Sequence, residues 1–334
     1  MASSPTSQPP AHNILFTIPR TASNLVTRLL NLPNQPNILP HPKDGYFFIH
    51  ALTSRYTHHA FDRPFRELSS SQQRNLSSSF SISLTIWSDL VTQAIVQKKG
   101  TYIKEHINWT IRPDIESRFL HDKSWSSAHH EGSTFNPTHI PASFLLNTLR
   151  PTFLIRHPAL TFPSLMRTAI DNEGIDALLT PASDNSMRWE ATYYWHVALY
   201  KFYAAHPSYP HASHDPSITY PIILDAEDLS NRELVRKYAA SVGLDPEVVR
   251  FEWDEAKKED VEGLGKVEKR MKDTLLASRG IRGDKLGRGE PLDLEAEKEG
   301  WKSEFGDVLG ERVGKLVEDA MEEYEWLWQR RLRI

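Results

Sequence analysis

The sequence predicts an α/β fold in which a central parallel sheet carries helices on both faces. Short β-favouring runs occupy residues 13–17, 101–106, 152–155 and 220–224, and segments with apolar residues at helical spacing lie between them. Strands that alternate with helices favour a parallel sheet, whose ligands bind at the carboxyl ends of the strands. We therefore expect the functional residues directly after these runs.

The first run leads into a polar loop and then into a helix. The helical face consists of Leu25, Val26, Leu29 and Leu30, and the loop before it reads Pro19-Arg20-Thr21-Ala22-Ser23-Asn24. Backbone N–H groups at a helix start, together with the Arg20 side chain, suit an anionic phosphate. The nucleoside triphosphatase pattern Gly-x4-Gly-Lys-(Ser/Thr) is absent, because no glycine or lysine occurs between Asn13 and Asn34. This absence counts against ATP or GTP hydrolysis.

The second run carries the residues best suited to chemistry. It follows a helical pattern formed by Leu84, Trp87, Leu90, Val91, Ala94 and Ile95, which Lys98-Lys99-Gly100 closes. Strand side chains alternate between faces, so Lys104 and His106 should point to one face and Glu105 to the other. A cation and an imidazole are thus predicted side by side at a strand end.

The third run ends in a predicted phosphate site. Arg156 follows residues 152–155, and Ser164 stands eight positions later, near the start of the next helix. A guanidinium that is always charged, at the carboxyl end of a strand and near a helix hydroxyl, suits a phosphate dianion.

The last third of the chain is explained mainly as structure. Ser230 with Glu233 forms a capping-box pattern that opens a helix after residues 220–224. A closing amphipathic helix is marked by Val313, Leu316, Val317, Ala320, Met321, Tyr324, Leu327 and Trp328. Two interruptions, residues 121–141 and 204–219, are expected over the mouth of the site, and the charged residues 252–300 could form a helix and lid.

These motifs resemble three segments of the sulfotransferases that use 3'-phosphoadenosine-5'-phosphosulfate (PAPS). Arg156-x7-Ser164 resembles the segment that holds the 3'-phosphate. The loop from Pro19 to Asn24 is similar to the 5'-phosphosulfate loop Pro-(Lys/Arg)-Ser-Gly-Thr-Thr, and most similar to that of a divergent branch associated with fungal small-molecule (secondary) metabolism. Lys104-x-His106 resembles the catalytic Lys-Thr-His. The order of the motifs covers most of the chain.

The resemblance implies a P-loop-like sulfotransferase fold, with transfer of a sulfuryl group from PAPS to a hydroxyl of a small-molecule metabolite. His106 would be the general base, and Lys104 would neutralise charge on the leaving phosphate of the product 3'-phosphoadenosine-5'-phosphate (PAP). The sulfate ester could be the product or a leaving group for later elimination or cyclisation. The implied cofactor contacts are Arg20, Thr21, Ala22, Ser23, Asn24, Arg156 and Ser164.

A further contact loop is implied near the carboxyl end. The family closes its cofactor site with Arg-Lys-Gly-x-x-Gly-x-Trp-Lys, and the pieces here look split: Arg279, Gly280 and Gly283 supply the first part and Trp301 the second. Three positions depart from the family pattern. Ala22 replaces a glycine, Leu25 stands where a tryptophan commonly stacks on adenine, and Ala226 replaces a tyrosine.

Composition agrees with a globular enzyme. The 334 residues are 39% hydrophobic and 25% charged, enough for one large core or two modest ones. The net charge of -4 argues against a nucleic-acid or anionic-membrane partner. The absence of cysteine removes disulfides, thiolate catalysis and cysteine zinc sites. The paired histidines stand in polar loops without a ligand spacing, so no metal is expected.

The expected organisation is one domain. Residues 1–12 are rich in Ser, Pro and Gln and should form a disordered tail and not a signal peptide, and residues 13–330 should form a single domain. No apolar run looks long enough to span a bilayer, so we expect no membrane partner and a cytoplasmic location. The acceptor and the oligomeric state stay open.

Two other function classes also stay open. A phosphoryl transferase on a P-loop-like fold is disfavoured by the missing Lys-(Ser/Thr) loop and by the lack of an evident Mg²⁺ aspartate. A descendant that keeps the anion site without sulfuryl transfer is kept because of the departures at Ala22, Leu25 and Ala226.

Overall fold

Four parallel strands form the centre of the molecule. A computed structural model describes residues 10–122, 125, 135–207, 209–287 and 292–334. The strand order is β2-β1-β3-β4, so β2 and β4 form the two edges of the sheet. The strand bounds are β1 His12–Thr17, β2 Thr101–His106, β3 Leu149–Ile155 and β4 Ile222–Asp225. The predicted α/β fold with a parallel sheet is confirmed.

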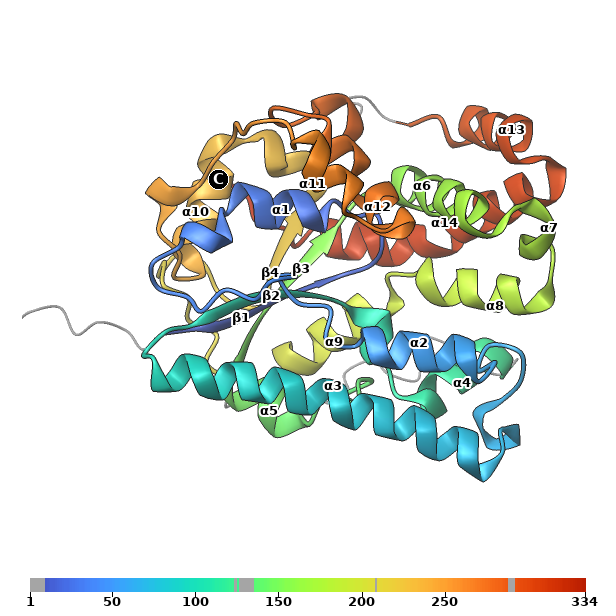
Figure 1. Ribbon diagram of the computed structural model, residues 1–334, viewed down its shortest axis with the longest axis horizontal. Coiled ribbons are helices and arrows are strands. Elements are labelled where there is room, and N and C mark those ends of the chain that lie inside the picture. The colour runs from blue at the N-terminus through green and yellow to red at the C-terminus, as the bar shows by residue number, and fades with distance from the viewer. Residues whose placement is uncertain (1–9, 123–124, 126–134, 208, 288–291) are drawn as a thin grey trace, which may run out of the picture.

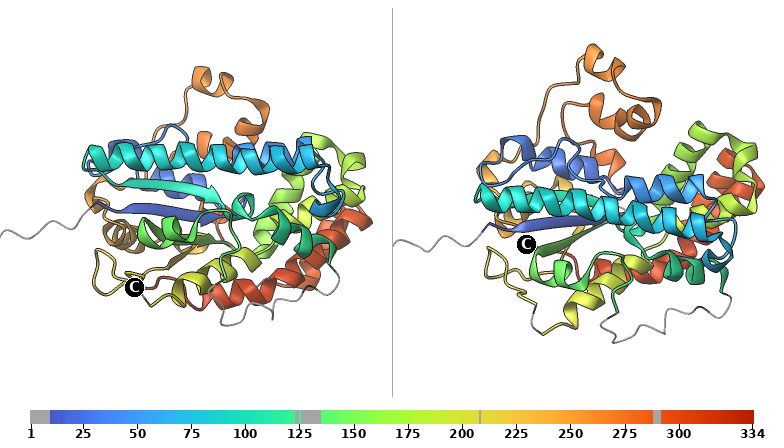
Figure 2. Two further views of the ribbon diagram at one scale, coloured as in Figure 1. Left: turned by 90° about the horizontal axis from the view of Figure 1, so that it is seen from below. Right: turned by 60° about the horizontal axis from the view of Figure 1, so that its bottom comes forward.

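Helices cover both faces of this sheet (Figure 1). On one side lie α1 (Ser23–Leu29), α10 (Arg232–Ser241), α11 (Lys258–Glu262) and α12 (Lys266–Leu276). On the other side lie α2 (Ile49–Thr57), α3 (Ser70–Val96), α5 (Ala142–Asn147) and α9 (Tyr194–Ala204). The helices α11 and α12 project from the body in Figure 2.

The remaining helices extend the molecule beyond the carboxyl ends of the strands (Figure 1). They are α4 (Pro113–His121), α6 (Pro158–Glu173), α7 (Ile175–Leu178), α8 (Pro181–Glu190), α13 (Leu294–Phe305) and α14 (Asp307–Trp328). The helix predicted around residues 313–328 is therefore present as α14.

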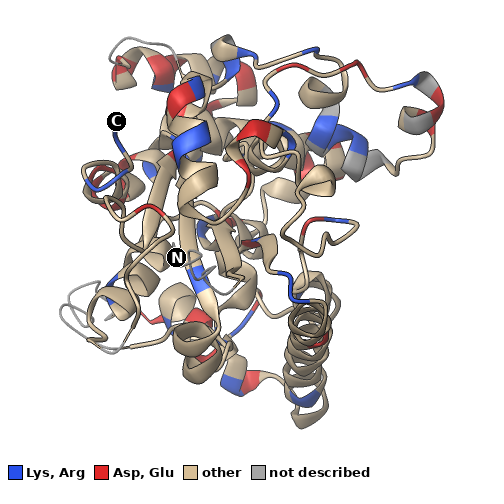
Figure 3. Ribbon diagram, turned by 90° about the vertical axis from the view of Figure 1, so that its left-hand side faces the viewer, with Lys and Arg blue, Asp and Glu red and all other residues tan. Residues whose placement is uncertain are grey.

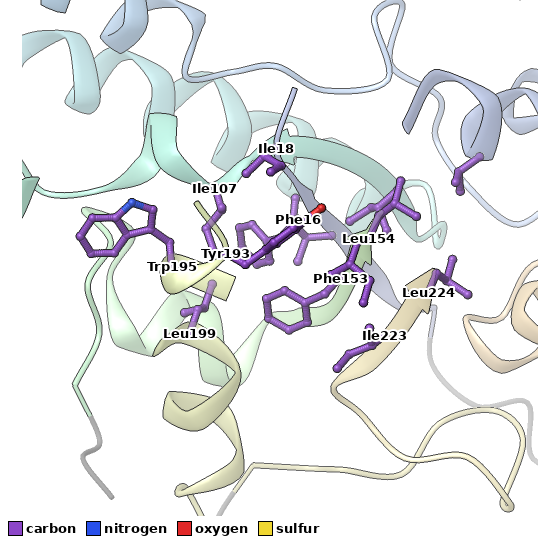
Figure 4. Packing of buried hydrophobic residues seen from close by; sticks show 14 of the residues in the cluster. Phe16, Ile18, Ile107, Phe153, Leu154, Tyr193, Trp195, Leu199, Ile223 and Leu224 are labelled. Atoms are coloured by element: carbon purple, nitrogen blue, oxygen red, sulfur yellow. The ribbon is translucent and has the colours of Figure 1, made fainter. Parts of the chain in front are cut away.

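The strands are buried along almost their whole length, as expected of a sheet with helices on both faces. Phe16 of β1 stacks on Phe153 of β3 with ring centroids 5.7 Å apart. Figure 4 shows these rings beside Tyr193 and Leu199 of the α9 region. Acidic and basic residues are interspersed along the ribbon in Figure 3, in keeping with the small net charge.

Several local expectations are corrected. The helix α10 is capped by Asn231, whose Oδ1 accepts from the N–H groups of Glu233 and Leu234 at 3.1 and 3.2 Å, so the predicted Ser230 cap is wrong. Ser230 instead ends the 3₁₀ helix η5 (Ala226–Ser230). The predicted tail is one residue too long, because His12 already belongs to β1; residues 1–9 lie outside the described part of the chain.

The expectation that residues 204–219 cover the mouth of the site is wrong. The Tyr209 hydroxyl donates to the carbonyl of Leu149 at 3.4 Å, and Leu149 is the first residue of β3. Tyr220, just beyond this segment, donates its hydroxyl to Asn13 near the start of β1 at 2.8 Å. The segment therefore lies at the amino ends of the strands. Residues 121–141 fall largely outside the described residues.

The helix α3 does not meet the expectation that no apolar run is long enough to span a bilayer. With 27 residues, it is long and apolar enough to cross a membrane by length and composition alone. Its buried side chains follow one stripe along the helix: Leu76, Ser79, Phe80, Ser83, Trp87, Val91 and Ala94. Such a stripe is typical of a helix that packs on a protein core.

Candidate active site

The predicted functional residues gather at the carboxyl edge of the sheet. β1 lies between β2 and β3, and its partners are Thr17 opposite His106 and Phe16 opposite Phe153. The loop that carries Arg20 therefore leaves the sheet between the end of β2 and the end of β3. This order brings the Lys104–His106 pair, the Arg20 loop and Arg156 to one side of the molecule.

Lys104 and His106 lie on the same face of β2, as predicted. The Lys104 ammonium donates to the side-chain oxygen of Asn24 in α1 and is only 2% exposed. The Nδ1 atom of His106 is 2.8 Å from the Thr17 hydroxyl, and that hydroxyl is also 3.4 Å from the Glu105 carbonyl oxygen. The loop and β1 thus hold both side chains of the predicted catalytic pair.

Glu105 points to the opposite face and is fully buried. Its carboxyl oxygens accept from the backbone N–H groups of Phe48 at 3.1 Å and His106 at 2.9 Å. Burial raises the pKa of Glu105 to about 8, and the bonds from these N–H groups only partly offset that rise. Glu105 fixes the backbone beneath the pair.

Burial also shifts both members of the pair toward their neutral forms. It lowers the pKa of Lys104 to about 8; Asp44 and Glu105 counteract this, while Lys272 adds to it. It lowers the pKa of His106 to about 3, and the nearby charge of Lys104 adds to the effect. At neutral pH the imidazole is therefore neutral and the ammonium is still mainly charged.

A second cluster joins the loop to the end of β3. Arg20 Nε donates to the Ser164 hydroxyl at 3.0 Å, and Arg156 Nη1 donates to the Arg20 carbonyl at 2.9 Å. Arg156 Nη2 donates to the carbonyl of Lys285, which ends the 3₁₀ helix η7 (Gly283–Lys285). Arg20, Arg156 and Ser164 are thus brought together.

The Nε–H of Arg156 is a candidate donor for a ligand. This N–H is buried and has no hydrogen-bond partner among the described residues. Burial lowers the pKa of Arg156 to about 10, and the charge of Arg20 acts in the same direction. The unpaired Nε–H of Arg156, in a cluster that also holds the Arg20 guanidinium, suits a phosphate oxygen.

The backbone of the loop explains the glycine of the family pattern. Ala22, which replaces that glycine, has φ 67° and ψ 26°, and Arg20 has φ 69°. This left-handed conformation costs a residue with a side chain about 1–2 kcal/mol relative to the right-handed one. Ala22 keeps the conformation without the glycine.

The other loop residues have different roles. The Thr21 hydroxyl donates to the carbonyl of Ile18 at 2.8 Å and is buried, so it braces the turn. Ser23 is buried at the start of α1, and Leu25 packs against the core.

Only part of the predicted closing loop lies against the Arg156 cluster. Lys285 contacts Arg156, but the Arg279 guanidinium is 78% exposed and pairs with Glu255 at 3.2 Å. Gly280 forms a β-bridge with Glu252, and Gly283 begins η7. Trp301 is 3% exposed and belongs to the core.

Three site residues were missed by sequence reasoning. Thr17 pairs with His106 through the strand register, which a single sequence does not reveal. Tyr46 lies against both members of the catalytic pair, and only the turn-forming Asp44-Gly45 before it was a signal. Asn108, two residues after His106, is fully buried, and neither of its side-chain polar atoms has a partner among the described residues.

Comparison with known proteins finds relatives along the whole chain. The sequence is 35% identical over 335 residues to "Sulfotransferase ppzF" of Metarhizium rileyi, covering 97% of both chains. It is 35% identical over 337 residues to the protein of the same name from Metarhizium majus, again covering 97% of both. No protein-family model matches the sequence. No solved structure matches it either.

Proposed function

Because the chain belongs to the sulfotransferase family of these fungal relatives, we propose that it transfers a sulfuryl group from PAPS to a hydroxyl of a small-molecule metabolite. The observation that carries the proposal is the convergence of Arg20, Arg156 and Ser164 beside the Lys104–His106 pair. The first set suits a phosphate dianion, and the second suits removal of a hydroxyl proton.

The residues present fit a doubly phosphorylated nucleotide. Arg156, through its unpaired Nε–H, and Ser164 would hold the 3'-phosphate. Arg20 and the loop that ends at Asn24 would hold the 5'-phosphate, next to Lys104. The donor substrate supplies the sulfuryl group, and the chain supplies fixed cations in place of a metal ion.

His106 is supported as the base by its hydrogen bonds. A Thr17 hydroxyl that donates to the Glu105 carbonyl can accept from His106 Nδ1–H, which leaves the lone pair of Nε2 for an acceptor hydroxyl. The low pKa keeps this imidazole unprotonated. An anionic donor beside Lys104 would offset the Lys104 charge, which adds to the effect of burial on the pKa of His106, and so make His106 a stronger base.

Lys104 would act on the leaving group. Its ammonium donates to Asn24 of the phosphate loop, and its side chain shares a strand face with His106. Negative charge grows on the bridging oxygen as the sulfuryl group departs, and a buried cation stabilises it more strongly than one in water. Asn108, with a buried and unpaired amide, is proposed to contact the acceptor.

The test compares PAP with AMP, which lacks the 3'-phosphate. For a chain of 334 residues, a ligand at about 100 times its Kd stabilises the native state by about 2.7 kcal/mol and raises Tm by about 4 °C. PAP should give this rise and AMP at equal concentration little or none. Each lost charge-assisted hydrogen bond should cost about 1.5–3 kcal/mol of binding.

The variants Arg156→Gln and Ser164→Ala should remove the preference for PAP. The matched control is Arg167→Gln, which alters an exposed arginine of α6 that pairs with Glu304. Isothermal titration below the Tm of each variant separates lost binding from lost stability. If AMP binds as tightly as PAP, or if both variants still prefer PAP, the 3'-phosphate assignment fails.

The rival phosphoryl transferase predicts a metal requirement. Among the described residues, no group of three or more His, Asp or Glu side chains could hold a metal ion. Asp225 at the end of β4 has its carboxylate bonded to the Glu227 N–H and the Tyr324 hydroxyl, both at 2.9 Å. Activity lost to a chelator and restored by Mg²⁺ would favour phosphoryl transfer. Tight PAP binding without turnover on any hydroxyl acceptor would favour a descendant that has lost sulfuryl transfer.

A further inference from the structure

A short strained segment lies against the end of β2. Residues 44–48, here called the strap, begin with three consecutive residues at positive φ: Asp44 at 54°, Gly45 at 133° and Tyr46 at 60°. A tyrosine in this region is rare, because its side chain crowds its own backbone. Such strain persists only where surrounding contacts hold it, and it concentrates at functional sites.

The strap is bound to both backbone polar groups of Lys104. The Lys104 N–H donates to the Asp44 carbonyl at 2.7 Å, and the Tyr46 N–H donates to the Lys104 carbonyl at 3.1 Å. Gly45 forms a parallel bridge with Lys104, and a Cβ atom at Gly45 would lie 1.9 Å from the Lys104 carbonyl oxygen. β2 is an edge strand and has no neighbouring strand on its outer side. At Lys104 the strap takes that place.

The strap is fixed again one residue further along β2. The Phe48 N–H donates to the buried carboxyl of Glu105 at 3.1 Å, and the other oxygen of that carboxyl accepts from the His106 N–H. The backbone around both proposed catalytic side chains is therefore tied to the same segment.

These bonds place the Tyr46 ring against both side chains. The ring centroid is 5.0 Å from the Lys104 ammonium nitrogen and 5.0 Å from the centroid of the His106 ring. The Trp109 ring also lies close to both aromatic rings. Its centroid is 5.6 Å from that of Tyr46 and 4.6 Å from that of His106.

We infer that Tyr46 is a positioning residue for sulfuryl transfer: its ring holds the Lys104 ammonium and the His106 imidazole in their working arrangement. The inference rests on the proposed roles of Lys104 and His106. A cation over the face of an aromatic ring is attracted by it, most strongly when both are removed from water. The ring face thus favours the charged form of Lys104 where burial opposes it.

The test replaces the ring and keeps its bulk. Tyr46→Leu should lower kcat by about 10- to 100-fold, because displacements on the order of 1 Å at reacting groups have effects of this size. It should also shift the alkaline limb of the kcat/KM profile to lower pH by about 0.5 to 1 unit. A pKa change of this size in Lys104 corresponds to the energy of one lost cation–π contact. The other charged groups that act on Lys104 are Asp44, Glu105 and Lys272 of α12, and they are unchanged in this variant.

Two variants serve as controls. Tyr46→Phe keeps the ring and should retain most of kcat and the position of the alkaline limb. Tyr56→Leu makes the same replacement at a tyrosine of α2 that is 47% exposed, and should change neither. PAP should stabilise all of these proteins equally, since Arg156 and Ser164 are untouched.

Failure of the inference is distinct from failure of the proposed function. Wild-type protein that neither binds PAP nor transfers a sulfuryl group from PAPS would remove the proposed function itself, and full activity in His106→Gln would remove only the role of His106. An inactive His106→Gln combined with wild-type kcat and pH profile in Tyr46→Leu would overturn only the role of Tyr46. Equal damage in Tyr46→Phe and Tyr46→Leu would assign the effect to the hydroxyl and also overturn it.

If Tyr46→Leu does not fold, phenylalanines with increasing ring fluorination at position 46 preserve the shape while weakening the negative face of the ring. Each added fluorine should shift the alkaline limb further to lower pH. A limb that stays in place through this series would refute the contact between the ring and the ammonium.

Discussion

Replacing His106 by glutamine should make the stability of the protein less sensitive to acid. Burial lowers the pKa of His106 from 6.5 to about 3 in the folded state. At pH 7.5 the imidazole is neutral whether the chain is folded or unfolded. At pH 5.0 it is protonated only in the unfolded chain, so the wild-type protein should lose about 2 kcal/mol of unfolding free energy through this residue. The glutamine variant has no such loss.

The measurement is a difference between two proteins at two pH values. Urea denaturation at pH 7.5 and pH 5.0 gives the unfolding free energy of each. The wild-type value minus the variant value should fall by about 2 kcal/mol between pH 7.5 and pH 5.0. Glu105 works in the opposite direction, because its raised pKa makes the folded state more stable as pH falls, but it is present in both proteins. His50→Gln, at an exposed position of α2, should show no such change.

The reasoning is refuted if the difference is the same at both pH values. His106 would then take up a proton as readily in the folded state as in the unfolded chain, so burial would not lower its pKa. Turnover of His106→Gln should also fall by about 10²- to 10⁴-fold, the usual contribution of a general base.

Three further results are expected. The kcat/KM of the wild-type enzyme should decline above about pH 8 as Lys104 loses its proton, and Lys104→Arg should abolish the decline because arginine keeps its charge. Thr17→Val should lower kcat by about 10-fold or more with little change in the Kd for PAP, measured by steady-state kinetics and calorimetry, because Nδ1 loses the partner that sets the tautomer. Arg20→Ala should weaken PAP and PAPS alike in calorimetry, and unchanged affinities would remove Arg20 from the phosphate site.

The sequence predicts most of the fold because its signals are local. All four strands are where the β-favouring runs stand, and β2 matches the predicted residues 101–106. The alternation of strand side chains was enough to place Lys104 and His106 on one face. By contrast, the cap of α10 was missed, because Ser230 and Asn231 are both good caps and only the backbone path decides between them.

The details of the site depend on contacts between distant segments. The sequence predicts that Arg156 and Ser164 share a site, but in the structure Ser164 bonds to Arg20 and Arg156 bonds to two carbonyl groups. The position of Tyr46 depends on a bridge to β2 across almost 60 residues of chain, which no local pattern encodes. The loop of residues 204–219 was assigned to the wrong edge, because composition reveals a loop without revealing at which end of the sheet it lies.

The left-handed turn at Ala22 bears on how such loops can change over time. The conformational cost of about 1–2 kcal/mol is a modest part of a typical stability of about 5–15 kcal/mol. The stability of the rest of the fold can therefore offset this cost when alanine stands in place of glycine. The turn and its backbone N–H groups then keep their positions. The turn requires a pair of backbone dihedral angles at this position, and a residue other than glycine can adopt them. A search pattern that insists on glycine would pass over this chain.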